Sequence, residues 1–350
     1  MKKILIVSRD VSLKQDGGTL VSKRNERLFQ ALGYKTERFI IPIPSHKILL
    51  KNILLKESYG SSLFLLKSFK KKLLDDYDYV FFDGSIYGGY LKLAYKYNKK
   101  IICFYHNVES EYYHQKAIST GSIPDKLMVP FIKYNENLST RYADFIITLN
   151  QRDSNVLKKI YGREADLLLP TSFNSKDLNK LYSSNIDSKD TFLLFVGTNF
   201  FANIDGLNRF IVNVAPSISC KVIIAGNIID SFDDRALPKN IEFVGKVLSL
   251  EEYYVNSSAV IAPIFSGSGL KTKTAEAISY GKTVIGYPEA FEGINWRNYP
   301  GSCIQVNSDS EFIDVINSLD MQKRYNHMSE KLFNENLSDE AQLRILKTLF

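Results

Sequence analysis

The stretch FSGSGLKTKTAEAISYGKTVIG, residues 265–286, joins the end of an apolar run to a helical pattern through a Gly-Ser-Gly turn. Gly267 and Gly269 fall in that turn, and the helix is expected over residues 270–280. Glycine lets the backbone approach an anion closely, and a helix N-terminus offers free N–H groups and the positive end of a dipole. A strand-to-helix turn of this kind is typical of a phosphate-binding site.

The charged residues of the same stretch extend this interpretation. Lys271 and Lys273 add two full positive charges beside the turn, and Glu276 lies seven residues after Gly269. A carboxylate at that place can accept two hydrogen bonds from vicinal hydroxyls, such as those of a ribose. Gly281 is placed to end the helix as a C′ glycine. A glycine-rich turn that only connects a strand to a helix would have the same spacing, so both interpretations stay open at this point.

The bulk composition sets the broad class of protein. A chain of 350 residues favours two domains, and 45% apolar with 24% charged residues is ordinary for a globular protein. The three cysteines are scattered without a CxxC pair, which argues against a disulfide framework or a zinc site and favours a reducing cytosol. The first apolar run stops at Val7, too short for a signal peptide, and no run is long enough to cross a bilayer.

Short apolar runs alternate with helical patterns in both halves of the chain, which predicts βαβ units and parallel sheets. Six strands are expected in the first half, over residues 4–8, 37–41, 79–83, 100–105, 143–149 and 167–169. Six more are expected in the second half, over residues 192–196, 221–225, 241–244, 259–263, 283–286 and 303–306.

The segment between the two halves is rich in Ser, Asn, Asp and Lys, and it predicts a linker or a loop with a short helix. The expected organisation is an N-terminal domain over 1–168, a linker over 169–190, a second domain over 191–325 and a C-terminal helix over 326–350. Doubly wound sheets bind ligands at the carboxyl ends of their strands, so two such domains would hold a ligand between them.

The net charge of +7 is unevenly distributed. Through residue 170 there are 28 basic and 17 acidic residues, and part of the excess lies in residues 47–74, where leucines recur at helical spacing among lysines. Such a stretch can lie on an anionic membrane surface, or it can form a solvated amphipathic helix packed on its own domain. Nucleic acid is disfavoured as a partner, because no recognition motif accompanies the lysines.

Two further places follow the ends of predicted strands. Gly17 and Gly18 follow the first strand and precede a helix expected over 19–32, so their backbone can touch a donor phosphate or an acceptor, or form only a turn. His106 follows the fourth strand, with Asn107 and Glu109 close behind. A histidine there can bond a sugar or stabilise charge at an anomeric carbon, although strand-end histidines are often structural.

Metal and nucleophile chemistry find little support in the sequence. The DDYD segment at residues 75–78 contains a DxD pattern but precedes a strand, which indicates surface charge. The four histidines are dispersed without the spacing of metal ligands, and no Gly-x-Ser-x-Gly elbow or Cys/His pair is present. No metal site is therefore expected.

The motif resembles the donor-site signature of retaining glycosyltransferases with the two-Rossmann GT-B fold, close to glycosyltransferase family 4. That signature has the form G-x-G-x-K-x-K-x-x-E-A-x-x-x-G-x-x-V. The matching residues here are Gly267, Gly269, Lys271, Lys273, Glu276, Ala277, Gly281 and Val284. Other segments resemble the family in the same order: FYHNVESEYY (104–113), ADFIITLNQRDSNVLKKIYG (143–162), LLFVGTNFFANIDGLNRF (193–210), KVIIAGN (221–227), IEFVGKV (241–247) and EAFEGI (289–294). The resemblance covers nearly the whole chain and is weakest near residues 45–75.

The resemblance implies an α/β fold of two Rossmann-like domains facing across a cleft, with the C-terminal helix crossing back to the first domain. It implies transfer of a hexose or hexosamine from a UDP- or GDP-sugar to a hydroxyl acceptor with retention, using no cofactor and no metal. With the basic first domain, it further implies a lipid-linked or otherwise anionic acceptor. The expected setting is cell-surface polysaccharide synthesis in the cytoplasm, at the inner membrane surface.

The resemblance also implies roles for single residues. The diphosphate would lie on the N–H groups near Ser268 and Gly269, Lys271 would neutralise the leaving group, and Glu276 would hold the ribose. His106 would face the donor sugar. The remaining expected contacts are Gly17, Gly18, Asn203, Gly267, Lys273 and Glu292 for the donor, and Asn107 and Glu109 for the acceptor.

Two departures from the family pattern keep alternatives open. Ser268 stands where most members have a second glutamate that contacts the sugar, and the basic pair expected near the start of the donor domain is missing from VGTNFFANIDG (196–206). A non-catalytic glycosyltransferase-like partner subunit and a nucleotide-sugar epimerase are therefore alternatives. A dehydrogenase is disfavoured because no G-x-G-x-x-G follows a first strand with an acidic residue after the second.

Overall fold

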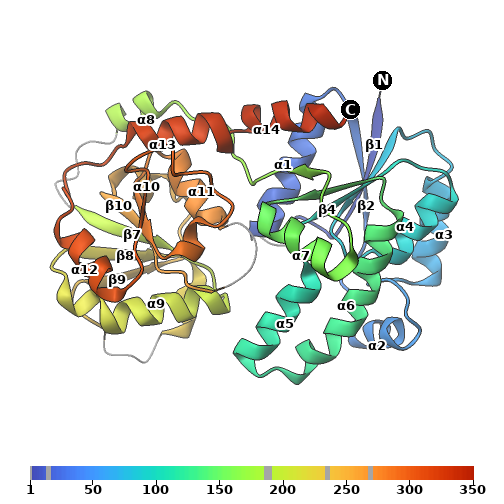
Figure 1. The fold of residues 1–350 in the computed structure, drawn as a ribbon, viewed down its shortest axis with the longest axis horizontal. Coiled ribbons are helices and arrows are strands. Elements are labelled where there is room, and N and C mark those ends of the chain that lie inside the picture. Colours follow the sequence, from blue (N-terminus) through green and yellow to red (C-terminus); the bar gives the residue numbers. More distant parts are fainter. Residues whose placement is uncertain (1, 13–16, 185–190, 233–236, 267–270) are drawn as a thin grey trace. The chain divides into compact units, whose positions relative to one another are not determined.

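The computed structural model describes residues 2–12, 17–184, 191–232, 237–266 and 271–350. The chain divides into two compact units. The first comprises Met1–Pro170 together with Gln342–Phe350, and the second comprises Thr171–Ala341. Each unit is a parallel sheet with helices on both faces (Figure 1).

The sheet of the first unit has six parallel strands in the order β2-β1-β3-β4-β5-β6. The strands β1, β3 and β4 are apolar on both faces, as expected for a sheet covered by helices on each side, and Ile4, Val7 and Phe82 are completely buried. The edge strand β2 is more polar and mostly not buried. The strand bounds are β1 (Lys3–Ser8), β2 (Lys35–Ile40), β3 (Tyr79–Asp83), β4 (Ile101–Tyr105), β5 (Phe145–Thr148) and β6 (Leu167–Leu168).

The helices of the first unit lie between these strands along the chain. Gly88 lets α4 pack closely on α6, since a Cβ there would lie 2.2 Å from the carbonyl oxygen of Asn135. The bounds are α1 (Gly17–Ala31), α2 (His46–Leu54), α3 (Leu63–Lys72), α4 (Gly88–Lys96), α5 (Glu109–Thr120), α6 (Ile123–Tyr142) and α7 (Gln151–Tyr161).

The sheet of the second unit has the order β12-β11-β10-β7-β8-β9, again fully parallel. Read from β9, this is the 3-2-1-4-5-6 order of a Rossmann fold, whose switch point lies between the first and fourth strands, here β7 and β10. The strand bounds are β7 (Phe192–Val196), β8 (Lys221–Ala225), β9 (Ile241–Gly245), β10 (Ala259–Ala262), β11 (Val284–Gly286) and β12 (Cys303–Gln305).

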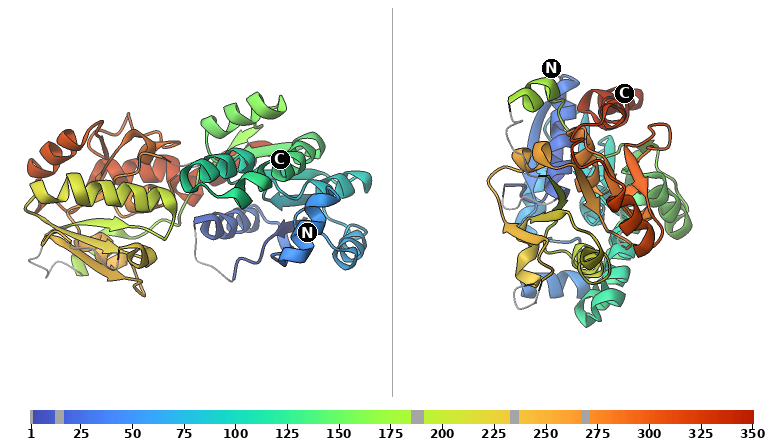
Figure 2. Two further views of the ribbon diagram at one scale, coloured as in Figure 1. Left: turned by 90° about the horizontal axis from the view of Figure 1, so that it is seen from below. Right: turned by 90° about the vertical axis from the view of Figure 1, so that its left-hand side faces the viewer.

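Helices cover both faces of this second sheet, as Figure 2 shows from two further directions. The α-helices are α8 (Leu178–Ser184), α9 (Phe201–Asn213), α10 (Glu251–Asn256), α11 (Thr272–Ser279), α12 (Asp309–Asn317), α13 (His327–Leu332) and α14 (Asp339–Leu346). Shorter helical turns are η1 (Ala215–Ser217), η2 (Asn227–Ser231), η3 (Pro288–Phe291), the π-helical η4 (Phe333–Leu337) and η5 (Lys347–Leu349).

The predicted fold class is confirmed, and all twelve predicted strands are present within two residues of their expected bounds. The polar segment between the halves contains the expected short helix, α8. The C-terminal segment also returns to the first unit, where Phe350 packs edge-on against Phe29 and Tyr79.

Three local predictions were wrong. Gly17 and Gly18 are not a turn but the first two residues of α1. The leucine- and lysine-rich stretch is two helices, α2 and α3, separated by a loop in which Gly60 has a φ of 69°. The expected single helix over 326–350 breaks at Ser338, whose extended backbone pairs with Phe173 and whose hydroxyl caps α14.

Candidate functional site

The glycine-rich turn of the second unit follows β10, beside the switch point of the sheet. Gly267, Ser268 and Gly269 lie outside the described residues. Helix α11 begins at Thr272, with Lys271 at its N-cap position, and ends before Gly281, which has the positive φ of 66° expected of a C′ glycine. The strand and the helix predicted on either side of the glycine-rich segment are therefore present.

Lys271 is held in place by a carboxylate. Its Nζ lies 2.7 Å from Oε1 of Glu289, and the two side chains are only 15% and 18% exposed. Glu289 comes from η3, immediately after β11, so the pair joins the loops that follow two neighbouring strands. A charge-assisted bond in such a partly buried place fixes the ammonium group firmly.

Glu276 lies one turn into α11 and is bound from two sides. Lys273 Nζ lies 2.7 Å from Oε2 of Glu276, and the hydroxyl of Tyr254 donates to the same oxygen at 3.3 Å. The ring of Tyr254 stacks on that of Tyr280 with centroids 4.6 Å apart. A cation and a phenol thus orient the carboxylate of Glu276. Both of these hydrogen bonds reach the same oxygen, Oε2.

A second lysine approaches the same helix from the start of the second unit. Lys176 Nζ lies 4.3 Å from the centroid of the Tyr280 ring and donates to the Ser279 hydroxyl at 3.1 Å. Burial lowers the pKa of Lys176, and the charge of Glu276 acts in the opposite direction. The sequence analysis missed Lys176 because it lies almost a hundred residues before the helix that it contacts.

Asn203 stands in the first turn of α9, directly after the loop that follows β7. Its amide donates to the carbonyl of Thr198 at 3.0 Å, so in this structure Asn203 stabilises that loop. The next turn passes very close to the end of β10, since a Cβ on Gly206 would lie 2.2 Å from the carbonyl oxygen of Pro263. The close approach brings the N-terminal part of α9 beside the segment that leads into the glycine-rich turn.

Arg209 is a cation that the sequence analysis did not select. Its Nε donates to Asp309 at 2.8 Å, and its guanidinium lies over the rings of Phe265 and Tyr287. With Asp205, Asn208 and Phe265, it lines a cavity of about 410 Å³. Arg209 lies about two turns into α9, on the helix that follows β7.

Glu292 ends η3 and is half-buried, three residues beyond Glu289. The structure places the carboxylate of Glu289 against Lys271. The sequence signal for Glu289 was its place in the same EAFEGI segment, but spacing alone could not choose between the two carboxylates.

In the first unit, His106 directly follows β4 and faces a buried aspartate. Its Nε2 lies 2.9 Å from Oδ1 of Asp83, the last residue of β3, and Asn25 Nδ2 donates to the same oxygen at 3.1 Å. Burial acts to raise the pKa of Asp83, but the neighbouring His106 imidazole and the Ser22 hydroxyl outweigh it and lower the pKa. The pair fixes the imidazole at the carboxyl edge of the sheet.

Glu136 of α6 is completely buried beneath the start of α5. It accepts hydrogen bonds from the backbone N–H groups of Glu109 and Ser110, at 2.8 and 3.1 Å, and from the hydroxyls of Ser85 and Tyr161, both at 2.8 Å. Helix α5 has no side-chain cap of its own, so Glu136 caps it from another helix. No local pattern in the sequence could reveal this contact.

Glu109, at the first position of α5, titrates near neutral pH. Burial and the charge of Glu136 raise the pKa of Glu109 to about 7, while His106, Asn107 and Arg9 act in the opposite direction. Asn107 lies in the short segment between β4 and α5, as expected. His106, Asn107 and Glu109 are therefore brought together with Asp83 at the ends of two adjacent strands.

Replacing Glu109 by glutamine is expected to raise the free energy of unfolding at pH 8, by at most about 3 kcal/mol, and to change it much less at pH 5. An unfolded chain releases this proton from about pH 4.5 upward, whereas the folded chain keeps it until about pH 7. Ionisation therefore costs stability across that window, and the full cost remains at higher pH. Urea unfolding at both pH values checks this, with the exposed Glu252→Gln as control; equal effects at the two pH values would contradict it.

Gly17 and Gly18 form the first turn of α1, which follows β1. Because β1 and β3 are neighbours in the sheet, this turn and Asp83 lie at the ends of adjacent strands. The residues predicted for the first unit thus gather at the carboxyl edge of its sheet, and those predicted for the second unit gather at the edge of the other.

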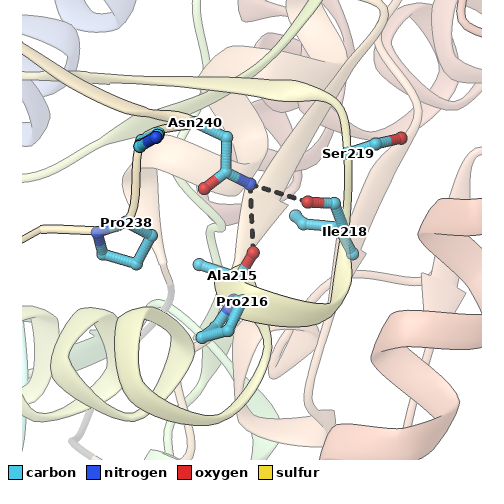
Figure 3. Close-up of a pocket in the computed structure, with 7 residues that line it drawn as sticks. Ala215, Pro216, Ile218, Ser219, Pro238 and Asn240 are labelled. Carbon is cyan, nitrogen blue, oxygen red and sulfur yellow. Dashed lines mark hydrogen bonds between the residues drawn. The ribbon is translucent and has the colours of Figure 1, made fainter.

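Other features of the described residues bear on the site only indirectly. A cavity of about 490 Å³ opens where β8 and β9 begin, at the opposite edge of the second sheet (Figure 3). The Asn240 amide in this cavity already donates to the carbonyls of Ala215 and Ile218. Asp76 and Asp78 of the DxD pattern are exposed, as predicted. Among the described residues, no helix is both long and apolar enough to cross a membrane, and no three His, Cys, Asp or Glu side chains gather as metal ligands.

Comparison with known proteins agrees with this architecture. Residues 190–319 match the family model of glycosyl transferases group 1. No curated protein sequence matches the chain.

Three solved structures align over nearly the full length of both chains. HepE of Anabaena with UDP-glucose has a TM-score of 0.67 at 11% identity, covering 100% of this chain and 99% of that one. A glycosyltransferase of Rickettsia africae has 0.65 at 15%, covering 99% and 97%. WaaG, a glycosyltransferase involved in lipopolysaccharide biosynthesis, has 0.62 at 15%, covering 99% of each chain.

The two parallel Rossmann-like sheets define the GT-B fold, which these solved structures share. Residues 190–319 of the second unit resemble the group 1 glycosyl transferases. The resemblance seen in the sequence is thereby confirmed for the donor domain.

Proposed function

We propose that this enzyme transfers a hexose or hexosamine from a nucleoside diphosphate sugar to a hydroxyl acceptor. The observation that carries the proposal is the pair of charged groups on one helix start: Lys271 at the N-cap of α11 and Glu276 one turn later. The cation and the helix N-terminus suit a diphosphate, and the carboxylate suits the ribose hydroxyls. The UDP-glucose bound by HepE supports a UDP-sugar as the first donor to test, with GDP-sugars next.

The proposed roles of the charged residues follow from the place where negative charge develops during sugar transfer. As the bond between the anomeric carbon and the diphosphate breaks, negative charge grows on the leaving oxygen. Lys271, the N–H groups at the start of α11 and Lys273 supply the compensating positive charge, so the reaction needs neither a metal nor a cofactor in this proposal. The residues Gly267, Ser268 and Gly269 would add backbone donors.

We place acceptor recognition on the first unit. His106, held by Asp83, would bond the donor sugar, Asn107 and Glu109 would face the acceptor, and Gly17 and Gly18 would present the N-terminus of α1. The family implies retention, in which the acceptor oxygen attacks the face that the diphosphate leaves and its proton passes to a departing phosphate oxygen. Asn203 and Glu292 would complete the donor side.

The acceptor that we propose is lipid-linked or otherwise anionic, in the synthesis of a cell-surface polysaccharide or glycoconjugate. The role of WaaG in lipopolysaccharide biosynthesis supports this setting. We place the reaction in the cytoplasm at the inner face of the membrane, because the three cysteines are unpaired and the first half of the chain is basic. The nucleotide base, the transferred sugar and the glycosidic linkage are left to experiment, beginning with the one below.

Slow hydrolysis of the donor in the absence of acceptor separates the alternatives. A catalyst should release labelled sugar from one of a panel of UDP- and GDP-sugars, and Glu276→Ala should lower that rate at least about tenfold. No release from any donor would favour a non-catalytic partner subunit. Conversion of the sugar to its epimer, still attached to the nucleotide, would favour an epimerase.

A further inference from the structure

The first unit exposes apolar side chains on two helices that the sequence pattern would have placed in a core. In α2 the only fully buried residue is Asn52, and in α3 it is Phe69. Leu65 and Leu66 are half-buried against the core, whereas five other large apolar residues of this region stay in solvent. Their exposed fractions are 58% for Leu50, 72% for Leu54, 60% for Leu55, 74% for Leu63 and 78% for Phe64.

The helix α3 therefore packs on its own domain through Phe69, Leu65 and Leu66, and the same stretch carries a second set of apolar side chains that stays exposed. An amphipathic helix packed on its own domain turns its leucines inward, and these leucines point outward. So many large apolar side chains exposed within one stretch are uncommon on a protein without a partner and indicate an interaction site. We call the exposed side chains of residues 46–72 the lysine–leucine face.

The charge of this face selects the kind of partner. Residues 46–72 carry seven lysines and one glutamate, and that glutamate pairs with Lys51. Lys47, Lys56, Lys67, Lys70 and Lys71 are exposed among the leucines. Lysines around a set of exposed leucines match an anionic lipid surface, which offers negative headgroups above an apolar layer.

A second exposed apolar cluster lies at the same end of the first unit. Figures 1 and 2 show α2 and the turn between α5 and α6 projecting at this end. Around that turn, Ile118 and Ile123 are each 67% exposed and Leu127 is 66% exposed. One flat surface can therefore contact α2 and this turn together.

We propose that the lysine–leucine face, with the turn between α5 and α6, docks the enzyme on an anionic bilayer. The leucines of α2 and the residues Leu63 and Phe64 enter the headgroup layer, and the lysines bind lipid phosphates. This inference assigns the membrane contact to a defined surface of the enzyme, and it does not depend on the identity of the sugar or the acceptor.

The test uses the full chain and vesicles of two compositions. We expect most of the protein to sediment with phosphatidylcholine vesicles that contain phosphatidylglycerol. We expect little of it to sediment with vesicles of phosphatidylcholine alone. Leu50→Gln/Leu54→Gln should weaken the partition at least about tenfold. Lys47→Gln/Lys51→Gln/Lys67→Gln should weaken it by a similar factor or more, and added salt should reduce the remaining effect.

Matched controls come from the second unit. Leu248→Gln/Val212→Gln removes two exposed apolar side chains, and Lys246→Gln/Lys323→Gln/Lys331→Gln removes three exposed lysines. Both controls should bind vesicles like the wild type, and donor hydrolysis should be unchanged in all four variants. Equal binding to both vesicle types, no binding at all, or equal losses in face and control variants would overturn the proposal. So would a dimer, without lipid, that Leu50→Gln/Leu54→Gln dissociates, since a second copy would then cover the face.

Discussion

Replacing Lys271 by glutamine is expected to lower kcat/KM for the nucleotide-sugar by about ten- to a hundredfold. Lys271 is the cation nearest the start of α11, and its ammonium is fixed by Glu289 at 2.7 Å in a mostly buried place. A preorganised charge aimed at the leaving group costs no reorganisation during the reaction. Glutamine is one atom shorter than lysine, keeps a polar group that can form hydrogen bonds, and removes the charge.

Steady-state kinetics with the preferred donor measures this effect. Lys246→Gln is the control, because Lys246 is exposed on the same unit and far along the chain from α11. The loss should appear in kcat as well as in kcat/KM, since charge on the diphosphate grows in the transition state. Wild-type kinetics in Lys271→Gln would remove this residue from the site and leave the phosphate role to other groups.

Replacing Lys282 by methionine is expected to lower the free energy of unfolding by about 3 kcal/mol or more. Lys282 is completely buried, and its Nζ donates to the carbonyls of Val255, Ser257 and Arg324 at 3.0, 2.7 and 2.5 Å. Burial lowers the pKa of Lys282 well below its usual value, whereas three carbonyl acceptors match the three donors of the ammonium form. Methionine would fill the space and leave three buried carbonyls without this partner.

Urea unfolding followed by circular dichroism measures the loss. Lys246→Met is the control for an exposed lysine, and it should change the free energy of unfolding by no more than about 0.5 kcal/mol. The carbonyls bound by Lys282 belong to the end of α10 and to the segment before α13, so the lysine joins parts of the chain distant in sequence. Equal stability of the two methionine variants would show that Lys282 does not hold these segments together.

The alternation of strands and helices could be predicted from the sequence because each strand is a short run of buried apolar residues, as in IICFY of β4. The motif on α11 could be predicted because its glycines, lysines and glutamate lie within one turn and one helix. In both cases the signal is local. The order of the strands could not be predicted in this way, because doubly wound sheets occur in more than one order and the two sheets here differ.

The contacts that complete the site join residues far apart in the chain, and local patterns could not reveal them. Asp83 and His106 are 23 residues apart, Glu136 caps a helix 27 residues before it, and Glu289 meets Lys271 across 18 residues. The exposed leucines of α2 and α3 were also ambiguous, because periodicity alone does not tell which way an amphipathic face turns.

Calorimetric titration with a panel of UDP- and GDP-sugars tests the central claim most directly, with Glu276→Ala as the paired variant. The site on α11 predicts that one donor binds the wild type with micromolar affinity and that Glu276→Ala loses about tenfold or more of it. Equal binding by the two proteins, or no binding of any donor by the wild type, would contradict the assignment of α11 as the nucleotide-sugar site.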